Sequence, residues 1–290
     1  MANEMILRVF DVEHGACAIL LAPNGKLAMI DCGHNSKTGW RPSTYIRNQL
    51  GRGVLSYFLV TNADRDHLSD VAGLRENGVH VEALIRNGSP SAPALRVLKE
   101  AEGPLTPGVA QFIHMHQTYW GFAVPFNDAM GGVTCATFCN RFPTFWKTND
   151  LSMATFIRFA GVKFLFPGDL EKAGWRGLLQ NPAFCAELQY TDIFVASHHG
   201  RQTGFCEDIF EYFRPQVVVI SDTGIKYETQ ETVPDYRDVV LSEDGVPVVI
   251  GDQLRRRHVL TTRKDGDIIF NVNAGGFRIT TTKDKYKRAA

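Results

Sequence analysis

The sequence predicts an α+β protein with two β-rich halves, each carrying helices and each placing polar side chains directly after buried strands. Short apolar runs recur through both halves of the 290 residues, and their length is typical of buried strands. Segments with helical spacing of apolar residues lie between them. Carboxylates, histidines and an asparagine follow three of the apolar runs, at 62–67, 169 and 198–199.

In the first half, glycine and proline separate a series of short strands and helices. Pro23-Asn24-Gly25 marks a turn between two apolar runs, and Pro42 stands at the first turn of an expected helix. Asp31 follows a strand and precedes Cys32-Gly33, so its carboxylate either braces a neighbouring loop or caps the turn. The expected elements are strands at 6–10, 17–21, 27–30, 58–60 and 81–85, and helices at 42–51 and 68–74.

Residues 87–148 form an expected insert with little regular structure. Its first part is rich in proline, glycine, alanine and serine around a helix at 95–100, and its second part, 111–148, is rich in aromatic residues. His114 and His116 alternate along an expected strand, where they form either a ligand pair or a plain polar face. The aromatic side chains either pack in the core or stack on bases.

The second half repeats the pattern of strands followed by polar residues. Gly161 marks the turn of a hairpin that leads into Asp169, and Ser197-His198-His199-Gly200 follows a later strand. The turn Lys264-Asp265-Gly266 predicts a second hairpin. The expected elements are strands at 154–160, 162–167, 192–196, 217–220, 259–262 and 268–272, and a helix at 175–179.

Composition and charge exclude some classes of function. Basic and acidic residues balance at 31 each, so no net field directs the molecule to nucleic acid or membranes. Residues 254–290 nevertheless carry ten basic and three acidic residues, and we expect a basic tail at 281–290 after a single domain of residues 1–280. No apolar run approaches about 18 residues and no signal peptide is recognisable, so we expect a cytoplasmic protein without a membrane span.

The stretch from Asn62 to His67 carries four ligand-type side chains in six residues. Asp64 and Asp66 alternate along it and can point the same way. Either these side chains bind a metal ion, or they form a polar strand-to-helix loop in which an aspartate caps the helix. Asp169 and the two adjacent histidines arrive from further strand ends, and buried carboxylates seldom lack a partner cation. Together the three segments predict a metal site.

The segments described above, taken in their order, resemble a known family. The segments that carry the resemblance lie in order along residues 5–275: Phe10-Asp11-Val12, Ile30-Asp31-Cys32-Gly33, NADRDH at 62–67, FPGDLE at 166–171, SHHG at 197–200 and TTRKDGDI at 261–268. They resemble the metallo-β-lactamase fold, and within it the branch of the cytoplasmic nuclease domain of the DNA-uptake protein ComEC. The resemblance implies an αββα sandwich of two mixed β-sheets flanked by helices, with a metal site at one sheet edge and hydrolysis, often of phosphodiesters.

The resemblance also implies a set of metal ligands. Asp64, Asp66 and His67 fall on the family's first ligand cluster, and Asp169 falls on the carboxylate that bridges two metal ions. Asn62 stands where the family opens its cluster with histidine, and an amide oxygen is a weak ligand for zinc. The oxygen-rich set then implies one or two divalent ions, zinc or manganese, with magnesium as a further alternative.

Further residues take roles by the same resemblance. His199 matches the last metal ligand and is preferred over its neighbour His198. Asp31 matches a structural aspartate that braces the ligand loop. Asn149 and Ser152 match a polar pair that the branch carries before the strand at 154, where we expect them to bind substrate.

The implied function is a metal-dependent hydrolase, most narrowly a phosphodiesterase or nuclease, that uses a metal-activated water. Asp66, Asp169 and His199 would be its catalytic groups.

Arg255, Arg257 and His258 form a basic stretch that either binds phosphate oxygens of a phosphodiester or nucleic-acid substrate or is a charged surface loop.

Asn62 motivates an alternative function, in which a degenerate member of the fold with an impaired first metal site acts as a binding or regulatory partner of another protein. A third alternative is a hydrolase of a small non-nucleic ester or amide.

Overall fold

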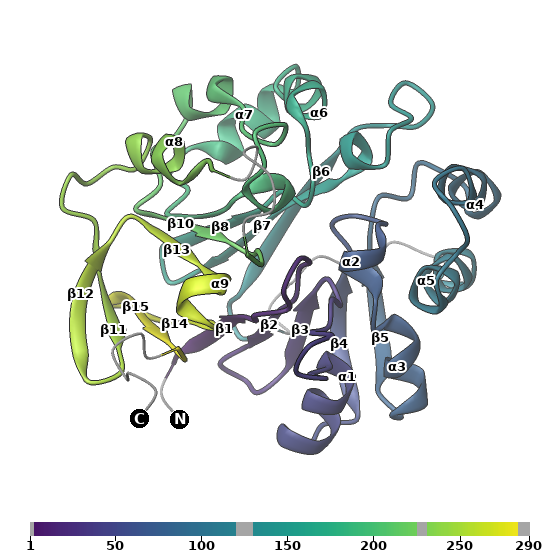
Figure 1. Ribbon diagram of the computed structural model, residues 1–290, viewed down its shortest axis with the longest axis horizontal. Coiled ribbons are helices and arrows are strands. Elements are labelled where there is room, and N and C mark those ends of the chain that lie inside the picture. Colours follow the sequence, from purple (N-terminus) through teal and green to yellow (C-terminus); the bar gives the residue numbers. More distant parts are fainter. Residues whose placement is uncertain (1–2, 120–129, 225–230, 284–290) are drawn as a thin grey trace.

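The computed structural model describes residues 3–119, 130–224 and 231–283, and in this part of the chain two β-sheets face each other (Figure 1). In spatial order, the nine-stranded sheet consists of β12 (Gln253–Arg257), β11 (Val246–Ile250), β15 (Gly276–Thr281), β14 (Ile268–Asn273), β1 (Met5–Val9), β2 (Ala18–Leu21), β3 (Leu27–Ile30), β4 (Val54–Leu59) and β5 (His80–Ile85). The six-stranded sheet consists of β13 (Val259–Thr261), β10 (Val217–Ile220), β9 (Ile193–Val195), β8 (Val162–Phe166), β7 (Met153–Phe159) and β6 (Thr134–Cys139).

The core between the sheets is made by side chains that alternate along the strands. Phe164 and Phe166 of β8 point into this core, whereas Leu165 belongs to the cluster on the opposite face. This alternation follows from the pleat, which turns successive side chains to opposite faces. Phe164 meets Phe270 of β14 edge to face, with ring centroids 5.2 Å apart. The aromatic pair therefore joins the two sheets directly.

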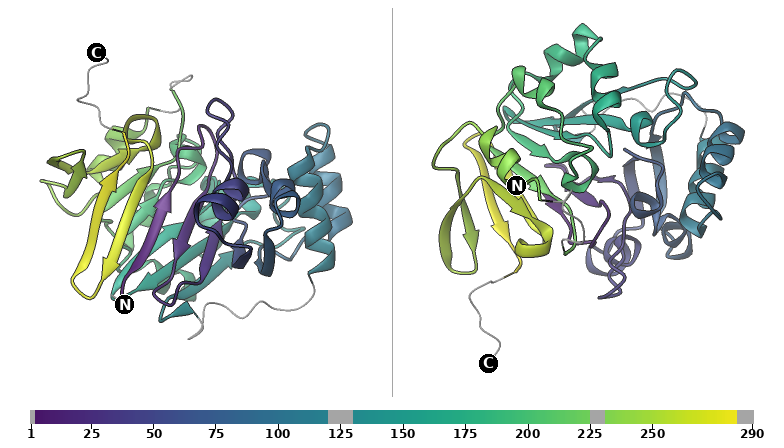
Figure 2. Two further views of the ribbon diagram at one scale, coloured as in Figure 1. Left: turned by 90° about the horizontal axis from the view of Figure 1, so that it is seen from below. Right: turned by 45° about the horizontal axis from the view of Figure 1, so that its top comes forward.

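Helices cover the outer face of each sheet (Figure 2). The nine-stranded sheet carries α1 (Pro42–Thr44) with the π-turn Tyr45–Gln49, α2 (Arg65–Leu68), α3 (Val71–Glu76), α4 (Ala92–Glu100) and α5 (Pro107–Thr118). The six-stranded sheet carries α6 (Lys172–Leu178), α7 (Pro182–Leu188) and α8 (Val233–Asp238), and Trp175 of α6 is fully buried there against Phe184 and Phe194. The order of layers is helix, sheet, sheet, helix, the αββα arrangement that the resemblance implies.

Parallel strand pairs bring several strand ends to one edge of the molecule. β3, β4 and β5 run parallel in the larger sheet, and β8, β9, β10 and β13 run parallel in the smaller one. Parallel neighbours have their carboxyl ends at the same edge of a sheet. The loops that follow β3, β4, β8 and β9 can therefore meet.

The predicted hairpin of residues 259–262 and 268–272 is wrong. β13 pairs with β10 in the smaller sheet, whereas β14 pairs with β1 and β15 in the larger one. Between them lies α9 (Thr262–Asp265), which ends at Gly266 with a φ of 70°. An Asp-Gly pair suits a helix end as well as a hairpin turn, and here it ends the helix through which the chain crosses between sheets.

The predicted strand carrying His114 and His116 is also wrong, because both residues lie on α5. Thr106 caps this helix by accepting a hydrogen bond from the Val109 amide, and Pro107 occupies its first turn. Residues two apart on a helix diverge by about 200°. His114 is accordingly exposed, while His116 is buried.

With α4, α5 and β6, much of the insert at 87–148 has regular structure. The aromatic residues Trp120, Phe122 and Phe126, and most of the expected basic tail at 281–290, lie outside the described residues. Among the described helices, none combines the length and apolar character needed to cross a bilayer.

We expect Phe164→Ala to lower the free energy of unfolding by about 3–5 kcal/mol, because it leaves a cavity between the sheets. Denaturant titration followed by circular dichroism measures this change. Leu254→Ala on β12 is the control, since Leu254 is 67% exposed and should change the free energy by only about 0.5 kcal/mol. Equal effects of the two substitutions would contradict the assignment of Phe164 to the core.

Candidate metal centre

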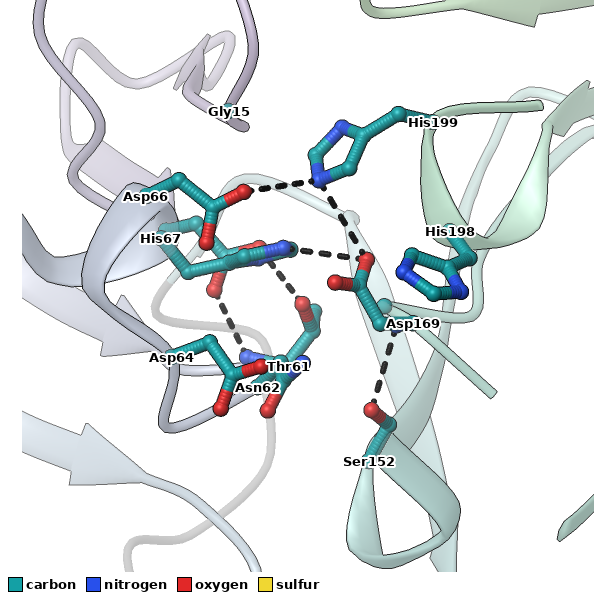
Figure 3. A network of polar contacts seen from close by, with 12 residues as sticks. Gly15, Thr61, Asn62, Asp64, Asp66, His67, Ser152, Asp169, His198 and His199 are labelled. Atoms are coloured by element: carbon teal, nitrogen blue, oxygen red, sulfur yellow. Dashed lines mark hydrogen bonds and ion pairs between the residues drawn. The ribbon is translucent and has the colours of Figure 1, made fainter. Parts of the chain in front are cut away.

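Loops after β3, β4, β8 and β9 supply the side chains of the candidate site (Figure 3). Asp31 is the first residue after β3. Asp66 and His67 lie on α2, which follows β4 after a short loop. Asp169 follows β8, and His199 follows β9. Four segments far apart in the sequence thus meet because their strands end at the same edge.

Asp66, His67, Asp169 and His199 form a group that could hold a metal ion. One ligand atom from each lies within 4.8 Å of all the others. The last three side chains are buried, and that of Asp66 is half-buried. Two carboxylates and two imidazoles are a donor set that suits zinc, manganese or iron.

His67 is held between two carboxylates. Its Nδ1 lies 2.8 Å from Asp31 Oδ2, and its Nε2 lies 3.0 Å from Asp169 Oδ1. Asp31 is itself fixed, because it accepts hydrogen bonds from the amide and the hydroxyl of Thr61. A carboxylate behind a histidine sets the tautomer and ring orientation of a metal ligand. Asp31 lies behind His67 in this geometry, and its bracing role stays a prediction.

His199 is oriented in the same way by a backbone carbonyl. Its Nδ1 lies 3.0 Å from the carbonyl oxygen of Ser221. Its Nε2 lies 3.2 Å from Asp66 Oδ2 and 3.5 Å from Asp169 Oδ1, yet it makes no hydrogen bond to a described residue and is buried. A buried polar atom without a partner is costly, and a cation among these four side chains would satisfy it. The residues present therefore fit a metal ion.

The backbone is strained at this edge. Asp31, His198 and His199 have φ values of 57°, 50° and 54°, in the left-handed region that residues other than glycine seldom adopt. Such residues cost of order 1–3 kcal/mol each and cluster at functional sites.

Both carboxylates of the group are charged at neutral pH. Burial alone would raise the pKa of Asp169, but His67 and His199 hold it well below its usual range. Burial likewise acts to raise the pKa of Asp66, but His199 and His67 lower it strongly. Deprotonated carboxylates are the form that binds metal ions.

Asp64 and Asn62, which the sequence places among the ligands, lie outside the group of four. Asp64 Oδ1 lies 2.6 Å from the Nζ of Lys99 on α4. The Asn62 amide donates to Asn149 Oδ1 at 3.2 Å, while its own Oδ1 is buried without a described partner. The first half of the predicted ligand cluster is thus engaged with protein groups.

His198 also lies outside the group. Its Nδ1 is 3.0 Å from the Thr203 hydroxyl. Ser152 is predicted to bind substrate. In the structure its hydroxyl accepts a hydrogen bond from the Asp169 amide at 3.1 Å, so it positions Asp169, one of the group of four.

The basic stretch predicted to bind phosphate lies at the far edge of the larger sheet, on and just after β12. Arg255 donates to Gln253 within the same strand. Arg257 pairs with Asp265, and His258 lies 2.7 Å from the carbonyl oxygen of Glu243. The structure therefore does not bring these three residues to the group of four.

Sequence reasoning missed two cations near the group, Lys99 and Arg201. Arg201 Nη2 lies 3.0 Å from His14 Nε2, and the His14 and His199 rings are 4.5 Å apart. Burial, with a further contribution from His199, lowers the pKa of His14 to about 4, so its ring is neutral. The sequence offers no signal for these contacts, which join residues distant along the chain.

No family model and no curated protein matches this chain. Among solved structures, the metallo-β-lactamase fold protein YhfI from Bacillus subtilis has a TM-score of 0.53 and 10% identity, over 93% of this chain and 99% of that chain. A diphosphatase of the PhnP family has a TM-score of 0.45 and 15% identity, over 93% and 99%. Igni18, a metallo hydrolase from Ignicoccus hospitalis, has a TM-score of 0.40 and 15% identity, over 82% and 87%.

The similarity to YhfI extends over nearly the whole of both chains, and at 10% identity it shows the fold alone. It agrees with the two facing sheets and their flanking helices. The predicted architecture is confirmed: this chain has the metallo-β-lactamase fold.

Proposed function

We propose that this protein is a metal-dependent hydrolase of phosphoesters, and of phosphodiesters in particular. The observation that carries the proposal is the convergence of Asp66, His67, Asp169 and His199 at one sheet edge. The buried Nε2 of His199 makes no hydrogen bond to a described residue and faces the carboxylates of Asp66 and Asp169, which supports a cation at the centre of this group. A divalent ion there would supply a Lewis acid and lower the pKa of a bound water from 15.7 to about 7.

The chain's own residues prepare this site. Asp31 and the Ser221 carbonyl turn the Nε2 atoms of His67 and His199 toward the two carboxylates. Ser152 holds the backbone of Asp169. These contacts fix the ligands before any ion arrives, and preorganisation of this kind limits the reorganisation that a reaction requires.

A cavity of about 1000 Å³ adjoins the group, with Asp66 on its wall. Its lining includes the cationic side chains of Arg65, Lys99 and Arg201. Arginine and lysine recognise phosphate oxygens by charge-assisted hydrogen bonds. The combination of ligand carboxylates and nearby cations supports an anionic substrate such as a phosphoester.

The order of the motifs NADRDH, FPGDLE and SHHG supports the ComEC-like branch and, within the phosphodiesters, nucleic acid as a substrate. The residues Arg255, Arg257 and His258 are not in the lining of the cavity. A nucleic acid would accordingly be held by the cavity cations rather than by this basic stretch.

The binding or regulatory alternative has one observation in its favour. Asn62 and Asp64 are engaged with Asn149 and Lys99 instead of facing the group of four. Under this alternative the protein would bind a metal ion but hydrolyse no ester, and it would act as a binding or regulatory partner of another protein.

Purified protein loaded with Mn²⁺, Zn²⁺ or Mg²⁺ is expected to hydrolyse bis(p-nitrophenyl) phosphate or single-stranded DNA. Asp169→Ala should reduce the rate to background, because it removes a ligand and leaves His67 and His199 without their shared carboxylate. Release of p-nitrophenol and gel assays measure the two activities. Full activity of Asp169→Ala would overturn the proposal, and metal binding without any hydrolysis would favour the regulatory alternative.

The two adjacent histidines should differ in their effect on metal content. We expect His199→Ala to lose bound metal, because Nε2 of His199 belongs to the group, and His198→Ala to retain it. Metal content after desalting is measured by mass spectrometry of the ion. The opposite result would show that His198 is the ligand.

Asp31→Asn should weaken metal affinity by about 10–100-fold, the usual effect of losing a carboxylate behind a ligating histidine. Competition with a chelator measures the affinity. Glu13→Gln is the matched control, because Glu13 lines the same cavity but pairs with Lys37 and Ser36. A loss of affinity in the control as large as in Asp31→Asn would refute a specific role for Asp31.

A further inference from the structure

Lys99 places a buried ammonium beside the candidate metal centre. The residue is 7% exposed, and lysine is almost never fully buried unless it is paired. Its Nζ lies 2.6 Å from Asp64 Oδ1 and also contacts Glu102. Lys99 belongs to α4, so a helix outside the sheets delivers this charge to the wall of the cavity.

Asp64 stands two positions before Asp66 of the metal group, and its side chain is 23% exposed. A half-buried carboxylate is partly withdrawn from water and is stabilised by a nearby cation. Lys99 supplies that cation from within the chain.

The contacts of Asp64 and Asn62 leave little for a second metal ion to bind. The ammonium of Lys99 already occupies Asp64 Oδ1. The amide nitrogen of Asn62 donates to Asn149, which leaves the neutral amide oxygen, a weak ligand, as the one side-chain atom of Asn62 that an ion can bind. Neither residue belongs to the group of four. A second divalent ion beside Asp64 would also face repulsion from Lys99.

Lys99 has a donor to spare. An ammonium carries three N–H donors, and the described contacts of Lys99 use two of them, to Asp64 and Glu102. Because Lys99 lines the cavity, the third can meet a ligand there. Its charge persists, since Asp64 and Glu102 outweigh burial and raise its pKa.

We propose that Lys99 is a fixed second cation of this site: the centre takes one divalent ion, and Lys99 binds an anionic oxygen of the substrate. This inference rests on the proposed function and adds to it a single-ion centre and a second point of substrate recognition. The two positive groups would flank the anionic part of the substrate, with Asp64 holding Lys99 in position.

The first test is metal stoichiometry. Wild-type protein titrated with Mn²⁺ in a calorimeter, and checked by ion mass spectrometry after desalting, is expected to bind one equivalent. Two equivalents in the wild type would overturn the inference while leaving the hydrolase proposal intact. Binding of no metal at all would instead refute the proposed function, so the two failures are distinguishable.

The second test is the affinity of the Mn²⁺-loaded protein for inorganic phosphate. Lys99→Met removes the ammonium but keeps an unbranched side chain, and we expect it to weaken phosphate binding at least about tenfold, the loss typical of a hydrogen bond to a charged group. Lys37→Met is the matched control, because Lys37 lines the same cavity but is largely exposed and paired with Glu13. We expect phosphate affinity to be unchanged in this control.

A second pair of variants keeps the test independent of folding. Lys99→Met leaves the half-buried carboxylate of Asp64 without its cation. The double variant Lys99→Met/Asp64→Asn is therefore compared with Asp64→Asn, because neither carries a carboxylate at position 64. The double variant should bind phosphate at least about tenfold more weakly than Asp64→Asn. Equal affinities in this pair, or an equal loss in Lys37→Met and Lys99→Met, would overturn the inference.

Discussion

The hydrogen-bonded series Asp31, His67 and Asp169 is the interaction on which the site depends. It begins at the end of β3 in the larger sheet, passes through α2 and ends after β8 in the smaller sheet. All three side chains are nearly inaccessible to solvent, where removal of one partner would leave a buried charge uncompensated. The series therefore ties the two sheets together at the edge where the candidate ligands converge.

The distribution of charge around this series divides the site into two parts. Asp66 and Asp169, with the two Nε2 atoms, present an arrangement suited to a divalent ion. Asp64 and Glu102 are matched instead by Lys99. One part is thus suited to a cation from solution, and the other is paired with a cation of the chain itself. The proposed single-ion centre would account for the asparagine at position 62, because no second ion would require an imidazole there.

Backbone strain at Asp31, His198 and His199 is consistent with a site maintained for function rather than for stability. The left-handed conformations at these positions are unfavourable locally. The well-packed core between the sheets, with Phe164 against Phe270, and the aromatic cluster around Trp175 provide the surrounding structure that holds them.

The sequence by itself determined the strands and the segments that carry the site. Alternating or continuous apolar runs located β7, β8 and β10 closely, because burial of strand faces leaves a direct pattern in the sequence. The change from apolar to ligand-type residues pointed to Asp66, His67 and Asp169, since each lies within a few residues of the end of a buried strand.

Only the tertiary structure decided which neighbouring groups meet. The choice between His198 and His199 depends on left-handed backbone conformations that residue types do not encode. Lys99 reaches Asp64 across 35 positions of sequence, and nothing in the amphipathic pattern of α4 distinguishes it from a surface lysine. The turn at Lys264-Asp265-Gly266 was misassigned because its local chemistry suits both a hairpin and a helix end. The strand pairing decided between a hairpin and a helix end, because β13 pairs with β10 and β14 pairs with β1.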